Sequence, residues 1–208
     1  LTKLLFRFYD PTEGAILLGS NVGHSPDRFD LRDARQAELR RHIGLVTQEV
    51  QLFHASVRDN LTLFDSSISD AQILAVLDDL DLLPWLSSLP NGLDSPLQAD
   101  ASLSAGEAQL LAFVRVFLAD PGLVIMDEAS SRLDPVTEMK IEQAIDKLLA
   151  NRTGIIVAHR LATVQRADEI MILGNGRIVE YGRRTQLASN PNSQFAQLLV
   201  TGLEEAIS

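Results

Sequence analysis

The chain has 208 residues, a formal net charge of −10 and 46% hydrophobic residues, which suits one large α/β domain or two small ones. This acidic balance, without a basic stripe, argues against a nucleic-acid partner, and the lack of cysteine excludes disulfides and cysteine-based metal sites. No stretch reaches the roughly 18 consecutive apolar residues of a membrane helix, and the first ten residues lack the cleavage site of a signal peptide.

The N-terminal quarter of the chain predicts a helix followed by alternating strands and turns. Leucine and phenylalanine recur at helical spacing over residues 1–8, and the segment DPTEG at residues 10–14 predicts a turn. The pattern then predicts a strand at residues 15–18, a loop at 19–30, a short polar helix at 34–41 and an apolar strand at 43–47. Because the chain begins without methionine and within a helical pattern, we expect a fragment or a processed chain.

The middle of the chain, from about residue 57 to residue 118, is mostly helical in pattern. Ser69 and Asp70 predict the start of one helix, whose apolar face comprises Ile73, Leu74, Leu77 and Leu80. A longer helix is predicted to begin near Ser104 and to end before the Asp-Pro-Gly at residues 120–122.

The last third of the chain returns to alternating strands and helices. The pattern predicts strands at residues 123–126, 154–158 and 170–173, and a helix at 136–149. The Gly-Asn-Gly at residues 174–176 predicts a tight turn into a hairpin strand at 178–181, after which helices close the chain. The coarse prediction is an α/β fold with a helical block inserted in its middle.

Two carboxylates, Asp127 and Glu128, follow directly after the apolar strand at residues 123–126. Ligands gather at the carboxyl ends of parallel strands, and paired acids there suit a hydrated Mg²⁺ and a water molecule to be activated. The alternative is a buried strand that ends in two solvated acids, and the dipeptide alone does not decide between these interpretations.

A small, glycine-containing turn opens the predicted helix at residues 103–109, whose sequence is LSAGEAQ. Backbone N–H groups and the Ser104 hydroxyl at the positive end of a helix could bind phosphate oxygens. The alternative is an ordinary N-cap by Ser104, with Glu107 as its capping-box partner.

The order and spacing of five landmarks give the chain a resemblance to the ATPase cassette of ABC transporters. LSAGEAQ resembles the family signature, LVIMDE at residues 123–128 the Walker B strand, and SRLD at 131–134 the D-loop. Gln48, at the end of the strand at 43–47, looks like the Q-loop glutamine, and His159 like the switch histidine. The stretches RFYDPTEGAI, QEVQLFHASVRDNL and AHRLATV are similar to those of exporter-type cassettes.

The resemblance implies a role for each matching residue in the hydrolysis of ATP. Asp127 would hold Mg²⁺, with Gln48 touching the metal or the attacking water. Glu128 would act as general base and His159 would bond the γ-phosphate. The signature residues Ser104, Ala105, Gly106 and Glu107 would face the γ-phosphate of a nucleotide bound to an opposite cassette, and Asp134 would lie at the same interface.

The resemblance also implies a P-loop NTPase-like fold, with a mostly parallel sheet flanked by helices and an inserted α-helical subdomain that carries the signature. Residues 1–55 and 120–208 would form the α/β core of one partial ATP-binding cassette, and about 56–119 the helical subdomain. The P-loop motif G-x-x-x-x-G-K-[ST] is absent from the sequence. We therefore expect a cassette truncated just after the P-loop, without its N-terminal strands and inactive by itself.

Two departures from the family pattern lie in the signature, where Ala105 replaces a glycine and Glu107 a glutamine. Alanine is small enough to leave room for phosphate. A carboxylate near the γ-phosphate is less favourable, unless Glu107 turns away as a capping partner.

The resemblance implies ATP and Mg²⁺ as cofactors and two partners. These are a second cassette in a head-to-tail dimer and a transmembrane domain fused upstream, at the cytoplasmic face of the plasma (inner) membrane. One alternative is a non-catalytic cassette, against which the presence of Glu128 argues. Another is a DNA-repair or chromosome-type ABC ATPase, which would carry long heptad insertions that this sequence lacks.

Overall fold

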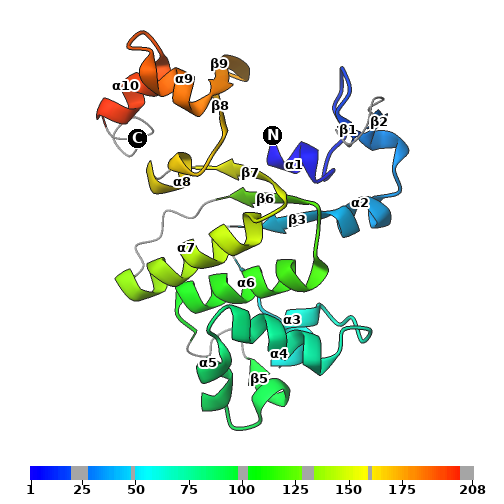
Figure 1. Cartoon of the computed structure of the whole chain (residues 1–208). Coiled ribbons are helices and arrows are strands. Elements are labelled where there is room, and N and C mark those ends of the chain that lie inside the picture. The colour runs from blue at the N-terminus through cyan, green and yellow to red at the C-terminus, as the bar shows by residue number, and fades with distance from the viewer. Residues whose placement is uncertain (20–27, 48–49, 98–102, 128–133, 159–160, 202–208) are drawn as a thin grey trace. The chain divides into compact units, whose positions relative to one another are not determined.

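A computed structural model describes residues 1–19, 28–47, 50–97, 103–127, 134–158 and 161–201 (Figure 1). The chain divides into two compact units, one comprising Leu1–Asp127 with Ser131–Ile155 and the other Glu128–Ser130 with Ile156–Ser208. Within the described ranges, no helix has both the length and the apolar character needed to cross a membrane.

A three-stranded sheet has the strand order β3 (Ile43–Val46), β6 (Leu123–Asp127) and β7 (Thr153–Val157), and its strands β3 and β6 belong to the first unit. Strands β3 and β6 are parallel, with Ile43 opposite Leu123 and Val46 opposite Met126. Val124 and Ile125 on the central strand are fully buried, as the apolar run of a strand with both faces covered predicts. The predicted strands at 43–47, 123–126 and 154–158 are therefore confirmed to within a residue or two.

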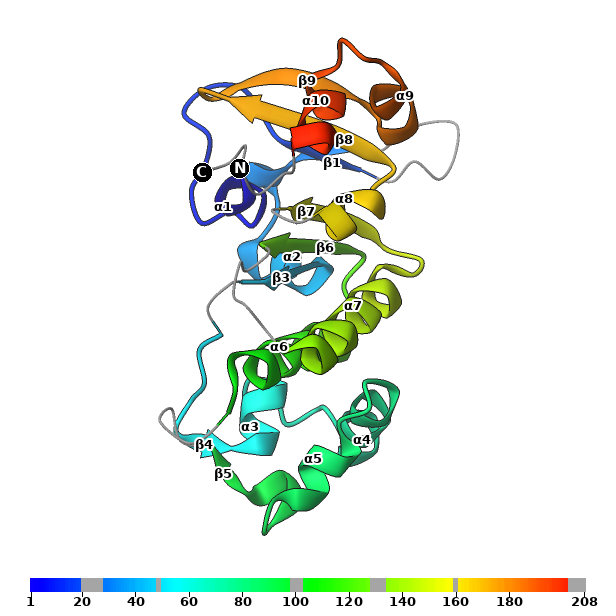
Figure 2. The ribbon, with the colours of Figure 1, turned by 90° about the vertical axis from the view of Figure 1, so that its left-hand side faces the viewer.

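Helix α6 (Ala105–Ala119) packs against β3 and lies beside α7 (Pro135–Leu149), as Figures 1 and 2 show. The approach of α6 to the sheet is so close that β3 needs a glycine. A Cβ atom built at Gly44 would lie 2.7 Å from both Pro121 Cγ and Val116 Cγ1. The buried residues of α6 are Gly106, Leu110, Leu111, Ala112, Phe113, Val114 and Val116.

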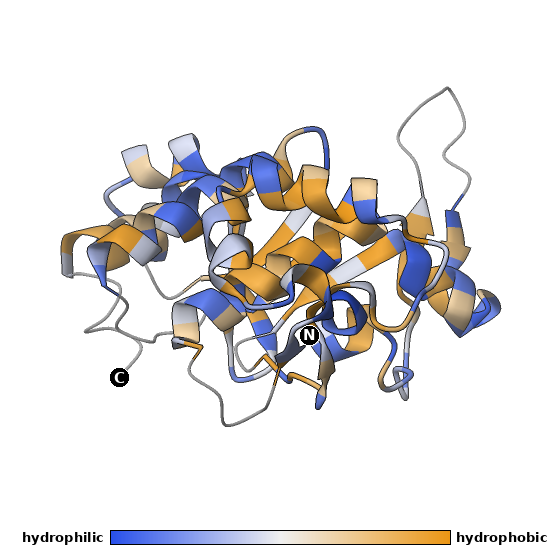
Figure 3. Ribbon diagram, turned by 90° about the horizontal axis from the view of Figure 1, so that it is seen from below, coloured by the Kyte–Doolittle hydropathy of each residue, from blue (hydrophilic) through white to orange (hydrophobic). Residues whose placement is uncertain are grey.

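Four short helices occupy the segment between β3 and α6. They are α3 (Val57–Thr62), α4 (Asp70–Asp79), α5 (Leu83–Ser88) and the 3₁₀ helix η2 (Gly92–Asp94), accompanied by the two-residue strands β4 (Ala55–Ser56) and β5 (Pro96–Leu97). Helices α3 and α4 both contact α6. Figure 3 shows polar and apolar residues on most of the helical turns, as expected of helices that bury one face.

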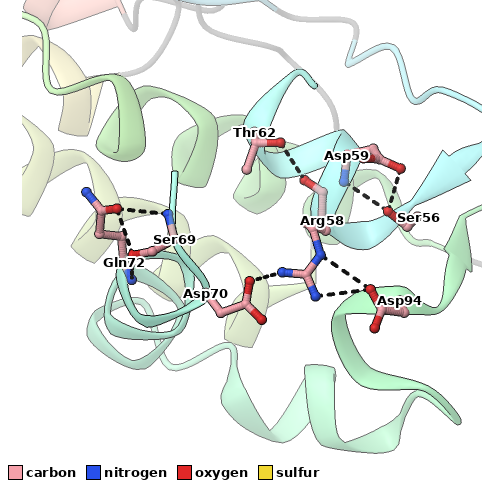
Figure 4. Close-up of polar contacts among 8 residues, drawn as sticks. All are labelled: Ser56, Arg58, Asp59, Thr62, Ser69, Asp70, Gln72 and Asp94. Carbon is pink, nitrogen blue, oxygen red and sulfur yellow. Dashed lines mark hydrogen bonds and ion pairs between the residues drawn. The ribbon is translucent and has the colours of Figure 1, made fainter. Parts of the chain in front are cut away.

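The predicted start of α4 is confirmed by a capping box. The Ser69 hydroxyl accepts from the Gln72 N–H, and the Gln72 side chain accepts from the Ser69 N–H at 2.9 Å (Figure 4). Ile73, Leu77 and Leu80 are buried as predicted, but Leu74 is 39% exposed. The prediction for Leu74 is wrong because helical spacing gives a broad stripe, and Leu74 lies at its edge.

The N-terminal elements of the first unit are α1 (Thr2–Leu5), β1 (Leu17–Gly19), β2 (Arg28–Asp30), η1 (Leu31–Asp33) and α2 (Gln36–His42). Helix α1 is shorter than predicted, since the chain turns at Arg7, which has a positive φ of 54°. The predicted loop at 19–30 is partly wrong, because residues 28–30 form β2 and pair antiparallel with β1, Leu17 opposite Asp30. Strand pairing has overridden the polar composition of this segment.

The second unit contains α8 (Leu161–Gln165), a hairpin of β8 (Glu169–Gly174) and β9 (Arg177–Arg183), α9 (Arg184–Ser189) and α10 (Gln194–Thr201). The predicted hairpin is confirmed, with Glu169 opposite Arg183 and a positive φ at both Asn175 and Gly176 in the turn. Val164 and Phe195 are buried at the centre of this unit.

Candidate functional site

The carboxyl edge of the three-stranded sheet carries Asp127, the last residue of β6, whose side chain is half-buried. Since β3 and β6 are parallel and Val46 lies opposite Met126, the segments that follow both strands leave the sheet at the same edge. Gln48 comes two residues after the end of β3 and Glu128 directly after β6, but both fall outside the described residues. Because of this register, the segments that lead to Gln48 and to Glu128 begin at neighbouring positions on the sheet.

The chemistry of Asp127 fits a hard divalent cation, since carboxylate oxygens are the ligands that Mg²⁺ prefers. The part of the chain that the structure describes holds no group of three His, Asp or Glu side chains that could form a metal cage. A Mg²⁺ ion that is held by one carboxylate and otherwise by substrate phosphates and water needs no such cage.

The signature residues lie at the first turn of α6, as predicted. Ser104 is the N-cap, and its hydroxyl accepts from the Glu107 N–H at 3.2 Å. Glu107 Oε2 in return accepts from the Ser104 N–H at 2.8 Å and from the Ser104 hydroxyl at 2.9 Å. Ala105 is exposed and Gly106 is buried.

This reciprocal pair is the capping box that the sequence offered as the alternative to a phosphate site. The first turn of any α-helix has N–H groups without a partner in the helix, and Ser104 is an exposed residue. A phosphate could therefore bind here if one of its oxygens took the place of the Glu107 carboxylate, which now accepts the hydrogen bonds of Ser104. Glu107 is turned toward its own helix cap.

Asp134 caps the other long helix. Its Oδ1 accepts from the N–H groups of Val136 at 3.1 Å and Thr137 at 3.0 Å. A hydrogen bond from the Thr137 side chain, followed by those from the backbone N–H groups of Thr137 and Val136, lowers the pKa of the Asp134 carboxyl below its ordinary value. The sequence resemblance assigned Asp134 only to an interface and missed this capping role.

His159 follows β7, which ends at Val157, and lies outside the described residues, as do Gln48 and Glu128. The structure thus brings together Asp127 and the segment that leads to Gln48, and it separately forms the turn with Ser104 to Glu107.

A polar contact that was not predicted from the sequence joins Asn60 on α3 to the half-buried Arg115 on α6. Arg115 Nε donates to the Asn60 carbonyl oxygen at 2.8 Å, and Asn60 is fully buried. The available signal was Arg115 itself, which interrupts an otherwise apolar run from residue 110 to residue 118. A charge within an apolar helix usually has a partner.

The described geometry is that of an α/β domain with an acid at the carboxyl end of a parallel strand and a capped helix bearing the signature sequence. A family model described as "ABC transporter" matches residues 1–131. The chain therefore belongs to the ABC transporter family, and it is an ATP-binding domain of that family.

Several curated relatives resemble nearly the whole chain. An uncharacterized ABC transporter ATP-binding protein of Bacillus subtilis (strain 168) is 38% identical over 90% of this chain and 30% of its own length. The mycobactin import ATP-binding/permease protein IrtA of Mycolicibacterium smegmatis is 38% identical over 100% of this chain and 23% of its own. The ATP-dependent lipid A-core flippase of Alcanivorax borkumensis is 36% identical over 95% of this chain and 33% of its own.

The chain thus spans about a third or less of the length of these relatives. The name of one relative describes an import ATP-binding/permease protein, and that of another an ATP-dependent flippase. The chain is homologous to the nucleotide-binding domains of such transporters, whatever cargo each of them carries.

Proposed function

We propose that this chain is the ATP-hydrolysing domain of an ABC exporter and that it works by ATP-driven dimerisation of two cassettes. The observation that carries the proposal is that β3 and β6 are parallel neighbours. The segments that lead to Gln48 and to Asp127–Glu128 therefore begin at the same edge of the sheet. The match to the ABC transporter family supports it.

In the proposed reaction each residue would have one task. Asp127 would hold Mg²⁺, which supplies charge neutralisation for the phosphates when it is bound. Gln48 would contact the same ion or the attacking water. Glu128 would take the proton of that water, and His159 would bond the γ-phosphate and keep the water in line.

The first turn of α6 would act on a different nucleotide. Its N–H groups and the Ser104 hydroxyl would bind the γ-phosphate of ATP held by a second, head-to-tail cassette, with Gly106 leaving room for the approach. Ala105 and Glu107 would lie at the rim of this site, and Asp134 at the same interface. The capping of α6 and α7 by Ser104 and Asp134 supports this proposal, because it gives both turns a defined position.

Within the cassette, residues 1–55 and 120–208 would form the α/β core and about 56–119 the helical subdomain. The ATP-binding/permease names of relatives support a transmembrane domain fused upstream, at the cytoplasmic face of the plasma (inner) membrane. Phe53 and Phe64, 46% and 58% exposed with ring centroids 5.4 Å apart, offer that domain an apolar contact.

Glu128→Gln in the intact protein tests the proposed reaction. We expect turnover to fall roughly 10²- to 10⁴-fold, the usual contribution of a positioned base. ATP binding should persist, because the carboxamide is nearly isosteric with the carboxylate. Steady-state phosphate release and equilibrium binding of labelled ATP measure the two quantities.

A matched control is Glu38→Gln, which changes the same functional group at an exposed position on α2, outside the residues proposed for the site. This control should leave turnover within about twofold. Near-normal turnover in Glu128→Gln would remove this residue from the mechanism. Wild-type protein that binds ATP but never hydrolyses it would favour the non-catalytic cassette instead.

A further inference from the structure

The chain contains two Asn-Gly steps, Asn91-Gly92 before the short helix η2 and Asn175-Gly176 between β8 and β9. An asparagine that precedes glycine is prone to lose its side-chain amide, because glycine has no side chain that keeps its backbone nitrogen away from the asparagine Cγ. The dipeptide is the same at both places. A difference in reactivity between the two steps therefore has to come from the fold.

Hydrogen bonds hold the first of these steps in place. The Gly92 N–H, whose nitrogen would be the attacking atom, donates to the Leu89 carbonyl oxygen at 3.4 Å. The Asn91 N–H donates to the hydroxyl of the buried Ser95 at 3.0 Å, and the Asn91 carbonyl oxygen accepts from the Asp94 N–H at 3.0 Å. Rotation of this backbone toward the Asn91 side chain would break these hydrogen bonds, so the fold opposes the reaction here.

The second step lies in an exposed two-residue turn. Asn175 and Gly176 have positive φ angles of 50° and 75°, and both residues are exposed. The ladder between the strands closes at Gly174 and Arg177, so the two turn residues lie outside it. In the part of the chain that the structure describes, neither the Gly176 N–H nor the Asn175 side chain forms a hydrogen bond. Both reacting groups are thus open to solvent.

The hairpin around this turn opens more readily than a larger sheet would. Among the described strands, β8 and β9 pair only with each other (Figure 2), and a two-stranded hairpin has little stability of its own. The register also shifts between Ile172 and Leu173, close to the turn. Ring closure needs rotation of the Asn175 backbone, and local opening at the end of the hairpin supplies that freedom.

We propose that Asn175 is a site of spontaneous covalent modification, deamidation through a succinimide, and that the fold protects Asn91 from the same reaction. A solvent base removes the proton of the Gly176 N–H, and the nitrogen attacks Cγ of Asn175. The bond from Cγ to the side-chain nitrogen breaks, and ammonia leaves with a proton from solvent. Water then opens the five-membered ring. The net change is hydrolysis of one amide, and it is independent of the proposed function.

The two directions of ring opening have different consequences for the hairpin. Opening at Cγ leaves an aspartate, which tolerates the left-handed conformation of this turn position. Opening at the main-chain carbonyl leaves isoaspartate, in which the chain runs through Cβ and Cγ and is longer by a methylene. A two-residue turn has no room for that methylene, so isoaspartate should unpair Gly174 from Arg177.

Mass spectrometry of the intact protein after incubation in mildly alkaline buffer tests the proposal, with Asn91 as the control within the same chain. Trypsin releases residues 167–177, in which Asn175 is the only amide side chain, and electron-transfer fragmentation distinguishes isoaspartate from aspartate. Asn175 should convert at least about tenfold faster than Asn91, because several hydrogen bonds must break at Asn91. In concentrated urea the two rates should agree within about twofold, since the protecting fold is gone.

Hydrogen exchange at Leu173 and Ile178, which pair next to the turn, checks the predicted consequence. Protection should fall in the isoaspartate product and persist in the matched variant Asn175→Asp, which has the same charge and a normal backbone. The proposal is overturned if Asn91 converts as fast as Asn175 in the folded protein. It is equally overturned if Asn175 stays intact there while both residues convert in urea, or if the isoaspartate product keeps the protection of Asn175→Asp.

Discussion

The carboxylate of Glu107 accepts a hydrogen bond from the Ser104 hydroxyl at 2.9 Å. If the first turn of α6 binds a γ-phosphate, a negative charge on Glu107 lies beside a group that carries several more. Two unit charges a few ångströms apart repel by about 1 kcal/mol even in water. The substitution of glutamine by glutamate in the signature is therefore expected to weaken closure on ATP.

Glu107→Gln should lower the ATP concentration for half-maximal dimer closure about fivefold, which corresponds to about 1 kcal/mol. The capping box should survive, because a glutamine oxygen accepts the same two hydrogen bonds. Closure of the intact protein, followed by light scattering or a distance label, measures this concentration. The gain should shrink with added salt.

The chain contains a second capping box that serves as the control. Gln72→Glu makes the reverse change beside Ser69 on α4, so it alters a helix cap without placing charge at the signature. It should not change the ATP concentration for closure. An unchanged concentration in Glu107→Gln, or a fall equal to that in Gln72→Glu, would contradict a charge effect at the signature.

At the scale of elements, the contact between α6 and the sheet depends on Gly44. A Cβ atom there would lie 2.7 Å from Val116 Cγ1 and from the ring of Pro121. We expect Gly44→Ala to lower the free energy of unfolding by about 1–3 kcal/mol, the usual cost of overpacking. Chemical denaturation of the intact protein measures the change.

Gly122→Ala is the control for this prediction, because a Cβ atom at Gly122 meets no atom within 4 Å. Its effect on the free energy of unfolding should stay within about 0.5 kcal/mol. Equal losses in the two variants would show that the packing at Gly44 does not decide the stability of this contact.

Helix α10 depends on a carboxylate from the hairpin. Glu180 accepts from the Phe195 N–H at 2.9 Å, from the Ser193 hydroxyl at 2.8 Å and from the Gln194 N–H at 3.2 Å. These bonds, that from Phe195 first, lower the pKa of Glu180 from 4.5. The stabilisation is fully present above pH 4.5 and is lost as the pH falls through the lowered folded-state pKa.

Hydrogen exchange along α10 checks this pH dependence. Protection of its amides should fall as the medium is acidified below about pH 4.5, and Glu180→Gln should show weaker protection at neutral pH with a smaller further loss in acid. Protection in Glu180→Gln that matches wild type at neutral pH would show that the carboxylate does not hold the helix.

Most elements could be predicted because their signals are local. Apolar runs predicted the strands that lead to Gln48 and Asp127. A serine followed three residues later by glutamine or glutamate marked the starts of α4 and α6. Strand β2 could not be predicted, since its pairing partner lies beyond a polar loop. The hydrogen bond from Arg115 to Asn60 joins residues 55 apart in the sequence, and no local pattern pairs them.

At the scale of the whole molecule, the 208 residues contain no P-loop. The chain by itself should therefore release phosphate from ATP at no more than the rate of a blank, because the P-loop supplies the lysine and most of the N–H groups that hold the phosphates. A malachite-green assay measures this rate. Release well above the blank that disappears in Glu128→Gln would contradict the prediction.

The measurement that tests the central claim most directly is the ATP-dependent association of this chain with an intact cassette that carries Glu128→Gln. Size-exclusion chromatography reports the association, and circular dichroism first confirms that each variant is folded. The account predicts a complex that needs ATP and that is lost in Gly106→Asp, because Gly106 lies in the turn that we propose to meet the partner's γ-phosphate. A folded chain that never associates, or an association that survives Gly106→Asp, would contradict it.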